Sequence, residues 1–224
     1  MQRLRCVRSG VPIQRDKEGE GGDAVKEKLD IIVTGVGGQG VITAATLLGK
    51  AAVSANINVL VSEVHGMAQR GGVVDCTVRM GDIHSPLVTK GSADVILSSE
   101  PVEALRQMEK ISDKTIVITD VNPVIPSTVA ITGQKYPKIE EVFKELKKHC
   151  QLITLDARSL AEQAGSMLAK NVVLLGALSA LDLLPFSKDV LLETILKNIP
   201  EKYASVNKKA FELGREAVLK QRKS

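Results

Sequence analysis

A glycine-rich turn between a predicted strand and a predicted helix is the feature that most restricts how this chain can fold. The apolar, β-branched run from Leu29 to Val33 predicts a buried parallel strand. It continues into Thr-Gly-Val-Gly-Gly-Gln-Gly at 34–40, and an Ala- and Leu-rich helix is predicted from Val41. Glycine permits the backbone angles of a tight turn, and its missing Cβ lets a ligand approach the main chain. This order of elements predicts the start of an α/β fold.

The glycine turn has three interpretations. Gly35, Gly37 and Gly40 complete a G-x-G-x-x-G pattern, and Glu63 ends the second predicted strand, where a dinucleotide site has its ribose-binding acid. The pattern alone favours that interpretation. The free N–H groups at the start of a helix also suit a phosphate of some other ligand. A turn without any ligand is the third interpretation, since many α/β turns are rich in glycine.

Strands and helices alternate along the rest of the chain. Strands are predicted at 57–63, 73–80, 94–97, 115–119, 129–132 and 152–155, with a hairpin return strand at 83–86. Helices are predicted at 41–55, 100–110, 138–149, 171–184 and about 201–221. A further helical region begins at Ala157, and another helix is capped by residues 187–189 and ends at Asn198. The alternation predicts a three-layer α/β/α, Rossmann-like sheet that is mostly parallel with an inserted hairpin.

The first 28 residues differ from the remainder. They are rich in Arg, Gly and Glu and show no hydrophobic period, which predicts a disordered extension or a wrongly assigned start codon. Residues 29–224 are predicted to form a single α/β domain that ends in C-terminal helices. No apolar run reaches the roughly 18 to 20 residues of a membrane span, so no membrane association is expected.

The composition argues against several classes of function. Three cysteines, Cys6, Cys76 and Cys150, are too few for an iron–sulfur cluster, which needs about four thiolates. Their odd number and wide spacing do not predict disulfides, so a reducing compartment, the cytoplasm, is expected. Aromatic residues make up only 2% of the chain, which argues against nucleic-acid binding by base stacking. The three histidines lack the spacing of metal ligands, so no metal site is predicted.

A second group of polar residues lies in the glycine-flanked loop after the second predicted strand. His65, Gln69 and Arg70 belong to this loop, which in a doubly wound sheet would lie near the first glycine turn. Arg70 could bind a carboxylate or phosphate through two hydrogen bonds. A structural ion pair with Glu63 is an equally good interpretation. No nucleophile lies near His65, so the histidine alone does not predict catalysis.

Two motifs together resemble a known family. Residues 34–40, together with Ser-Glu-Val-His-Gly-Met-Ala-Gln-Arg-Gly-Gly at 62–72, are similar to the γ-type subunit of 2-oxoacid:ferredoxin oxidoreductases. Within that family the likeness is greatest to the small (β) subunit of the indolepyruvate:ferredoxin oxidoreductases. Pyruvate and 2-oxoglutarate enzymes share the glycine turn and the Arg-Gly-Gly ending, but the residues before that Arg usually differ. The likeness runs from Leu29 to the C-terminal helix.

The resemblance implies a division of labour within a complex. A large (α) subunit would hold thiamine diphosphate with Mg²⁺ and the [4Fe-4S] clusters, whereas this chain would bind no cofactor and be inactive alone. The implied reaction, part of amino acid catabolism, is the oxidative decarboxylation of an arylpyruvate with coenzyme A. Its products are the acyl-CoA, CO₂ and reduced ferredoxin. The difficult chemistry would then belong to the cofactor of the partner.

The resemblance suggests candidate binding residues but no catalytic residue. The phosphate-approaching turn would consist of Gly35, Gly37, Gly38, Gln39 and Gly40, and the loop facing the substrate or coenzyme A would contain Glu63, His65, Gln69 and Arg70. Three alternatives stay open. The chain could serve an enzyme for pyruvate, 2-oxoisovalerate or 2-oxoglutarate, it could be a stand-alone NAD(P)-binding protein, or it could be a purely structural subunit.

Overall fold

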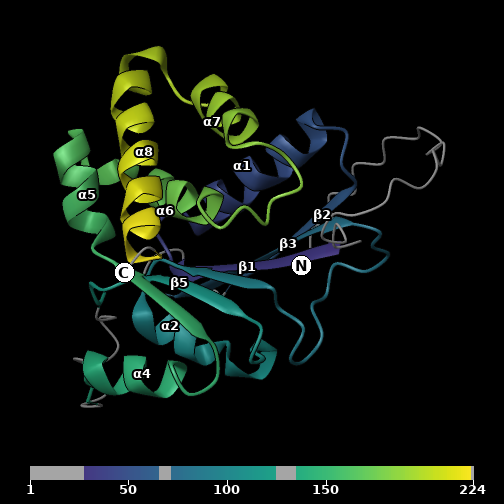
Figure 1. Cartoon of the computed structure of the whole chain (residues 1–224), viewed down its shortest axis with the longest axis vertical. Coiled ribbons are helices and arrows are strands. Elements are labelled where there is room, and N and C mark those ends of the chain that lie inside the picture. The colour runs from purple at the N-terminus through teal and green to yellow at the C-terminus, as the bar shows by residue number, and fades with distance from the viewer. Residues whose placement is uncertain (1–27, 66–71, 125–134, 223–224) are drawn as a thin grey trace.

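A mixed sheet of six strands forms the middle layer of the computed structural model, which describes residues 28–65, 72–124 and 135–222 (Figure 1). The strand order across the sheet is β2-β3-β1-β4-β5-β6. The predictions made for residues 1–27 and for a strand at 129–132 lie outside the described residues. The strands are β1 (Lys28–Val36), β2 (Val59–His65), β3 (Val73–Gly81), β4 (Val95–Ser98), β5 (Ile116–Asp120) and β6 (Gln151–Leu155).

Strand β3 separates the sheet into two differently built parts. β1, β4, β5 and β6 pair in parallel, whereas β3 runs antiparallel to both β1 and β2. The predicted mostly parallel sheet with an inserted hairpin is therefore confirmed, but its hairpin is formed by β2 and β3. The predicted return strand at 83–86 is wrong. Because β3 is already paired along both edges, it offers no edge to a further strand.

Helices cover both faces of the sheet, which confirms the three-layer prediction (Figure 1). One face carries α1, α5, α6, α7 and α8, and the opposite face carries α2 and α4. The helices are α1 (Val41–Ser54), α2 (Pro101–Arg106), α4 (Ile139–Leu146), α5 (Ala157–Ala164), α6 (Lys170–Ser179), α7 (Lys188–Lys197) and α8 (Ala204–Gln221). None of the helices in these ranges is long and apolar enough to cross a membrane.

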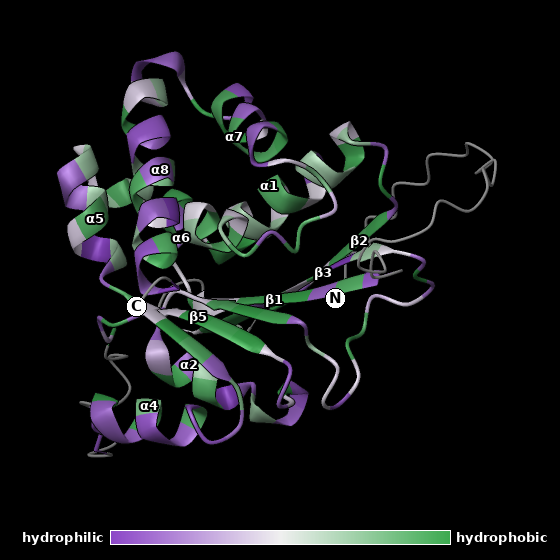
Figure 2. Cartoon of the chain, in the orientation of Figure 1, coloured by the Kyte–Doolittle hydropathy of each residue, from purple (hydrophilic) through white to green (hydrophobic). Residues whose placement is uncertain are grey.

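Each face of the sheet has its own apolar core (Figure 2). Along β1, Ile31 and Val33 belong to the core beneath α1, α6 and α8, whereas Ile32 belongs to the core beneath α2 and α4. This alternation follows from the two-residue period of a strand. Burial on both sides accounts for the continuous apolar run that marks β1 in the sequence.

Helices α6 and α8 cross at two glycines that let their backbones touch. A Cβ added to Gly176 in α6 would lie 2.0 Å from the carbonyl oxygen of Phe211, and one added to Gly214 in α8 would lie 1.9 Å from that of Val173. Both distances are far shorter than any real Cβ contact. Helix α6 ends at Ser179, earlier than the predicted 184.

A buried ion pair joins β1 and β3 beneath the antiparallel part of the sheet. The Arg79 Nε and Nη2 atoms donate to the two carboxylate oxygens of Asp30, at 2.7 and 3.0 Å. Arg79 Nη1 also donates to the carbonyl oxygens of Ser85 and Leu87, at 2.6 and 2.8 Å. The residues predicted as a return strand therefore form a loop that is fastened to β3 through a side chain.

Candidate functional site

The glycine turn joins the carboxyl end of β1 to the start of α1. Gly38 and Gly40 have positive φ angles of 95° and 74°, which favour glycine. The Gln39 N–H donates to the Val36 carbonyl at 3.1 Å, which closes the turn. Among the described residues no side chain caps α1, and its first turn contains no acidic residue. The N–H groups and partial positive charge at this helix start can therefore receive an anion.

Three glycines of the turn, Gly35, Gly38 and Gly40, have different reasons to lack a side chain. A Cβ on Gly35 would lie 1.9 Å from Ser99 Oγ, and one on Gly40 would lie 2.0 Å from Asn171 Nδ2. Packing against Ser99, which directly follows β4, therefore favours glycine at position 35, whereas at position 40 the positive φ angle favours glycine and the Asn171 side chain lies close by. A Cβ on Gly38 would meet nothing within 4 Å, and this exposed residue needs glycine for its backbone angles.

Gln39 turns its side chain inward. Its Oε1 accepts hydrogen bonds from the Val36 N–H at 2.8 Å and from Ser99 Oγ at 2.7 Å, and its Nε2 donates to the Ser99 carbonyl at 3.4 Å. The amide thus fastens the turn to the end of β4. At this position Gln39 stabilises the turn through its side chain, and any contact it makes with a ligand would come from its backbone.

The structure argues against a dinucleotide at this turn. In a dinucleotide-binding fold the acid that binds the ribose ends a strand next to β1. Here β3 intervenes, because Glu63 pairs with Cys76 and Cys76 pairs with Val33. With strands about 4.8 Å apart, Glu63 lies about 10 Å from β1. A hydrogen bond from Ser99 Oγ to Gln39 Oε1 also joins the ends of β1 and β4, between which a dinucleotide would lie.

The end of the predicted substrate loop lies against the glycine turn. The Gly37 N–H donates to the Gly72 carbonyl at 2.7 Å, so the two segments meet as expected from the sequence. Glu63 is exposed near the end of β2, and His65 is the last residue of that strand. Gln69 and Arg70 lie outside the described residues, so their roles stay predictions.

An apolar groove of about 700 Å³ runs between α1 and β2. Its size matches that of small-molecule sites, which are typically about 300 to 1,000 Å³. Ile42, in the first turn of α1, lines the end of the groove nearest the glycine turn, and Glu63 and Lys50 supply charge. The lining residues are Ile42, Thr46, Gly49, Lys50, Val53, Ser54, Val59, Val61, Ser62 and Glu63.

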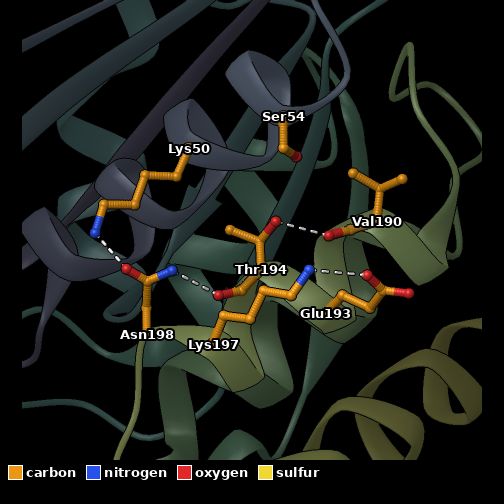
Figure 3. Close-up of a pocket in the computed structure, with 7 residues that line it drawn as sticks. All are labelled: Lys50, Ser54, Val190, Glu193, Thr194, Lys197 and Asn198. Atoms are coloured by element: carbon orange, nitrogen blue, oxygen red, sulfur yellow. Dashed lines mark hydrogen bonds and ion pairs between the residues drawn. The ribbon is translucent and has the colours of Figure 1, made fainter.

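A smaller polar cavity of about 310 Å³ lies between the C-terminal part of α1 and one side of α7 (Figure 3). Its polar groups are already paired with one another. Asn198 contacts Lys50 and donates to the Thr194 carbonyl at 2.8 Å, and Lys197 pairs with Glu193 at 3.2 Å. These contacts indicate that the cavity belongs to the packing interface between α1 and α7. It is lined by Lys50, Ser54, Val190, Glu193, Thr194, Lys197 and Asn198.

Lys170 and Asn171 bring the start of α6 to the glycine turn, and sequence reasoning missed both. Lys170 Nζ donates to the Ser99 carbonyl at 2.9 Å and forms an ion pair with the buried Asp120 at the end of β5. Asn171 lies directly over Gly40. An acid at the end of a strand and a lysine at the start of a helix are the only sequence signals for this arrangement.

The described cysteines and acids do not form a redox or metal centre. Burial raises the pKa of the Cys76 thiol to about 12 and that of the Cys150 thiol to about 11, so neither is reactive near neutral pH. Within ranges 28–65, 72–124 and 135–222, no group of His, Cys, Asp and Glu side chains could hold a metal ion. Fold and site define an α/β domain whose first helix begins, without a side-chain cap, at a glycine-rich turn.

The family comparison agrees with this class. Residues 30–217 match the family model described as pyruvate ferredoxin/flavodoxin oxidoreductase. The chain therefore belongs to the pyruvate ferredoxin/flavodoxin oxidoreductase family, and the resemblance seen in its two motifs is confirmed.

Curated relatives refine this assignment. The chain is 41% identical over 188 residues to indolepyruvate oxidoreductase subunit IorB of Archaeoglobus fulgidus, covering 84% of this chain and 94% of that protein. It is 44% identical over 191 residues to the subunit of that name from Thermococcus kodakarensis, covering 84% and 95%. Identity to 2-oxoglutarate synthase subunit KorC of Methanocaldococcus jannaschii is 27% over 195 residues, covering 86% and 95%.

Solved structures share the fold at lower sequence identity. The gamma subunit of a keto/oxoacid ferredoxin oxidoreductase from Geobacter sulfurreducens superposes with a TM-score of 0.63 at 22% identity. That match covers 86% of this chain and 99% of the other. The fold predicted from the sequence is therefore the fold of a solved gamma subunit.

Proposed function

We propose that this chain is the small subunit of an indolepyruvate:ferredoxin oxidoreductase. The observation that carries the proposal is the 36–44% identity to subunits of that name, against 27% to a 2-oxoglutarate synthase subunit. The reaction would be the coenzyme A-dependent oxidative decarboxylation of arylpyruvates, with ferredoxin reduced through the complex. A subunit for pyruvate, 2-oxoisovalerate or 2-oxoglutarate is the alternative.

A large subunit would supply the cofactors. Thiamine diphosphate, Mg²⁺ and [4Fe-4S] clusters provide the decarboxylation and electron-transfer chemistry in the proposed complex. The described residues of this chain do not fit such groups, because their two thiols, the buried Cys76 and the half-buried Cys150, lie in separate parts of the fold and no cluster of metal ligands occurs among these residues. We therefore place all three on the partner, within a cytoplasmic complex.

The role of this chain would be to bind coenzyme A. The uncapped start of α1 would hold a phosphate of coenzyme A, since its N–H groups and dipole favour an anion. The less polar pantetheine arm would follow the apolar groove between α1 and β2. The segment containing Glu63, His65, Gln69 and Arg70 would face coenzyme A or the oxoacid.

The proposal is tested on the complex purified through a tag on this chain. We expect a co-purifying large subunit and dye reduction that depends on both indolepyruvate and coenzyme A, with lower kcat/KM for pyruvate and 2-oxoglutarate. A complex that prefers one of the latter acids would support the alternative. A chain that purifies alone and binds a nicotinamide cofactor would contradict the proposal.

An acidic residue introduced at the start of α1 should weaken coenzyme A binding. Thr43 is exposed and is the third residue of α1, so the carboxylate of Thr43→Glu would occupy the anion site. We expect the KM for coenzyme A to rise about tenfold or more, equivalent to about 1.4 kcal/mol. The melting temperature should stay equal or rise, since acids stabilise the first turn of a helix. The matched control is the isosteric Thr43→Gln, and equal KM values for both variants would remove α1 from the site.

The Arg70→Ala change should raise the KM for coenzyme A or the oxoacid. Loss of a charge-assisted hydrogen bond costs about 1.5 to 3 kcal/mol, which corresponds to a KM roughly 10 to 150 times higher. The measurement is steady-state kinetics of the assembled complex, with the exposed Lys209→Ala in α8 as control. Kinetics equal to those of the control would exclude Arg70 from substrate binding.

A further inference from the structure

A buried carboxyl group without a hydrogen-bond partner lies beneath the sheet in α2. Glu103 is 3% exposed, and within the part of the chain that the structure describes its Oε2 atom has no hydrogen-bond partner. Its other oxygen, Oε1, lies 3.4 Å from Arg106 Nε, but the Arg106 side chain is 60% exposed and thus surrounded largely by water. The buried oxygen is not explained by the oxidoreductase assignment.

Other ionisable groups face Glu103 from three elements. Glu100 caps α2, because its Oε2 accepts the Glu103 N–H at 2.9 Å, and its Oε1 accepts the hydroxyl of Tyr136, just before α4. Asp75 approaches from β3, where its Oδ1 accepts the Thr34 hydroxyl at 2.5 Å. Arg106, from α2 itself, supplies the one opposing charge that acts on Glu103 among the described residues.

These surroundings disfavour an ionised Glu103. Burial is the main cause that raises the pKa of Glu103 to about 7; the charge of Arg106 opposes the rise, and the carboxylates of Glu100 and Asp75 add to it. A protonated Glu103 adds no charge to this cluster. An ionised one places a third negative charge there, on an oxygen to which the described residues donate no hydrogen bond.

We propose that Glu103 is a proton-binding switch that controls the Tyr136–Glu100 contact and so the attachment of the chain entering α4 to α2. While Glu103 is protonated, Tyr136 stays hydrogen-bonded to Glu100. Ionisation makes the buried oxygen require a donor, and repulsion from Glu100 opens the packing so that water reaches it. The Tyr136–Glu100 contact is then lost. The switch involves α2, Asp75 of β3 and Tyr136, and it does not rest on the proposed coenzyme A function.

Tyrosine resonances provide the test, because the chain contains only two tyrosines, Tyr136 and Tyr203. We would label tyrosine with ¹³C in the full chain, assign the two ring signals with Tyr203→Phe, and titrate between about pH 5.5 and 8.5. We expect the Tyr136 signal to shift with a midpoint near pH 7 while Tyr203 stays constant. Burial and the Glu100 contact raise the pKa of Tyr136, so its own ionisation does not contribute in this range.

Two variants test whether Glu103 is the group that binds the proton. Glu103→Gln should abolish the Tyr136 titration, with the fold checked by circular dichroism. Arg106→Gln, an exposed change, should move the midpoint to higher pH, because it removes the positive charge that favours ionised Glu103. A Tyr136 signal that stays constant across this range overturns the switch. So does a titration that persists in Glu103→Gln, or a midpoint that Arg106→Gln leaves unchanged.

Discussion

Gly176→Ala should destabilise the protein by about 3 kcal/mol or more, a large effect for a single added methyl group. The new Cβ would lie 2.0 Å from the Phe211 carbonyl oxygen, so α6 and α8 must move apart by more than 1 Å. Alanine is the better helix former by about 1 kcal/mol, and that gain is far smaller than the cost of separating two packed backbones. Eight residues of α6 are buried, so the displacement would disturb the larger core.

The matched control is Gly49→Ala in α1. Its Cβ would meet only the Cγ2 atom of Val61, at 2.8 Å, and a side chain at the edge of a groove can move. Denaturant unfolding should therefore show a change within about 1 kcal/mol for Gly49→Ala. Equal effects of the two substitutions would mean that the α6–α8 crossing is not limited by backbone contact.

Arg79→Met should cost about 3 to 5 kcal/mol of unfolding free energy. The substitution leaves the Asp30 carboxylate fully buried with its main partner removed, and it frees the carbonyls of Ser85 and Leu87 from their donor. Lys28 Nζ lies 3.7 Å from Asp30 but is half-exposed, so it cannot replace a bidentate guanidinium. Chemical denaturation near neutral pH measures the loss.

Two comparisons separate this effect from a general loss of charge. Arg158 is exposed and pairs with Glu162 at 3.2 Å. Arg158→Met should therefore lower the unfolding free energy by less than about 1 kcal/mol. The double variant Arg79→Met, Asp30→Asn should recover part of the stability, because it removes the unpaired buried charge. If the double variant were as unstable as Arg79→Met, the cost would come from the freed carbonyls of the loop.

Local sequence patterns predict the individual strands and helices better than they predict which strands pair with one another. The run from Leu29 to Val33 and the glycines after it define β1, its turn and α1 within a few residues, since strand, turn and helix signals are all local. Strand pairing is not local. The alternating pattern of β3 does not reveal that β1 and β2 pair with its two edges. The sequence therefore wrongly predicts that residues 83–86 form its partner strand in a hairpin.

The sequence predicts only part of the candidate site, because its other residues reach the site through contacts between distant parts of the chain. The sequence identified the glycine turn, but Ser99, which fastens Gln39, lies 60 residues further along the chain. Glu103 was unremarkable in the sequence because acids are common at the start of a helix. Only the packing of α2 against the sheet and α4 shows that its carboxyl group is buried near those of Glu100 and Asp75.

The larger apolar core joins Leu29 in β1 to Val218 in α8, so it cannot close until nearly the whole chain has been synthesised. At about 5 to 20 residues per second, a ribosome needs roughly 7 to 27 s to proceed from the end of β3 to Val218. During that interval α1 is already present, but α6 and α8, which complete the core, have not been synthesised. We expect truncation before α8 to leave the apolar residues of α5 and α6 that it covers exposed, so that the shortened protein aggregates.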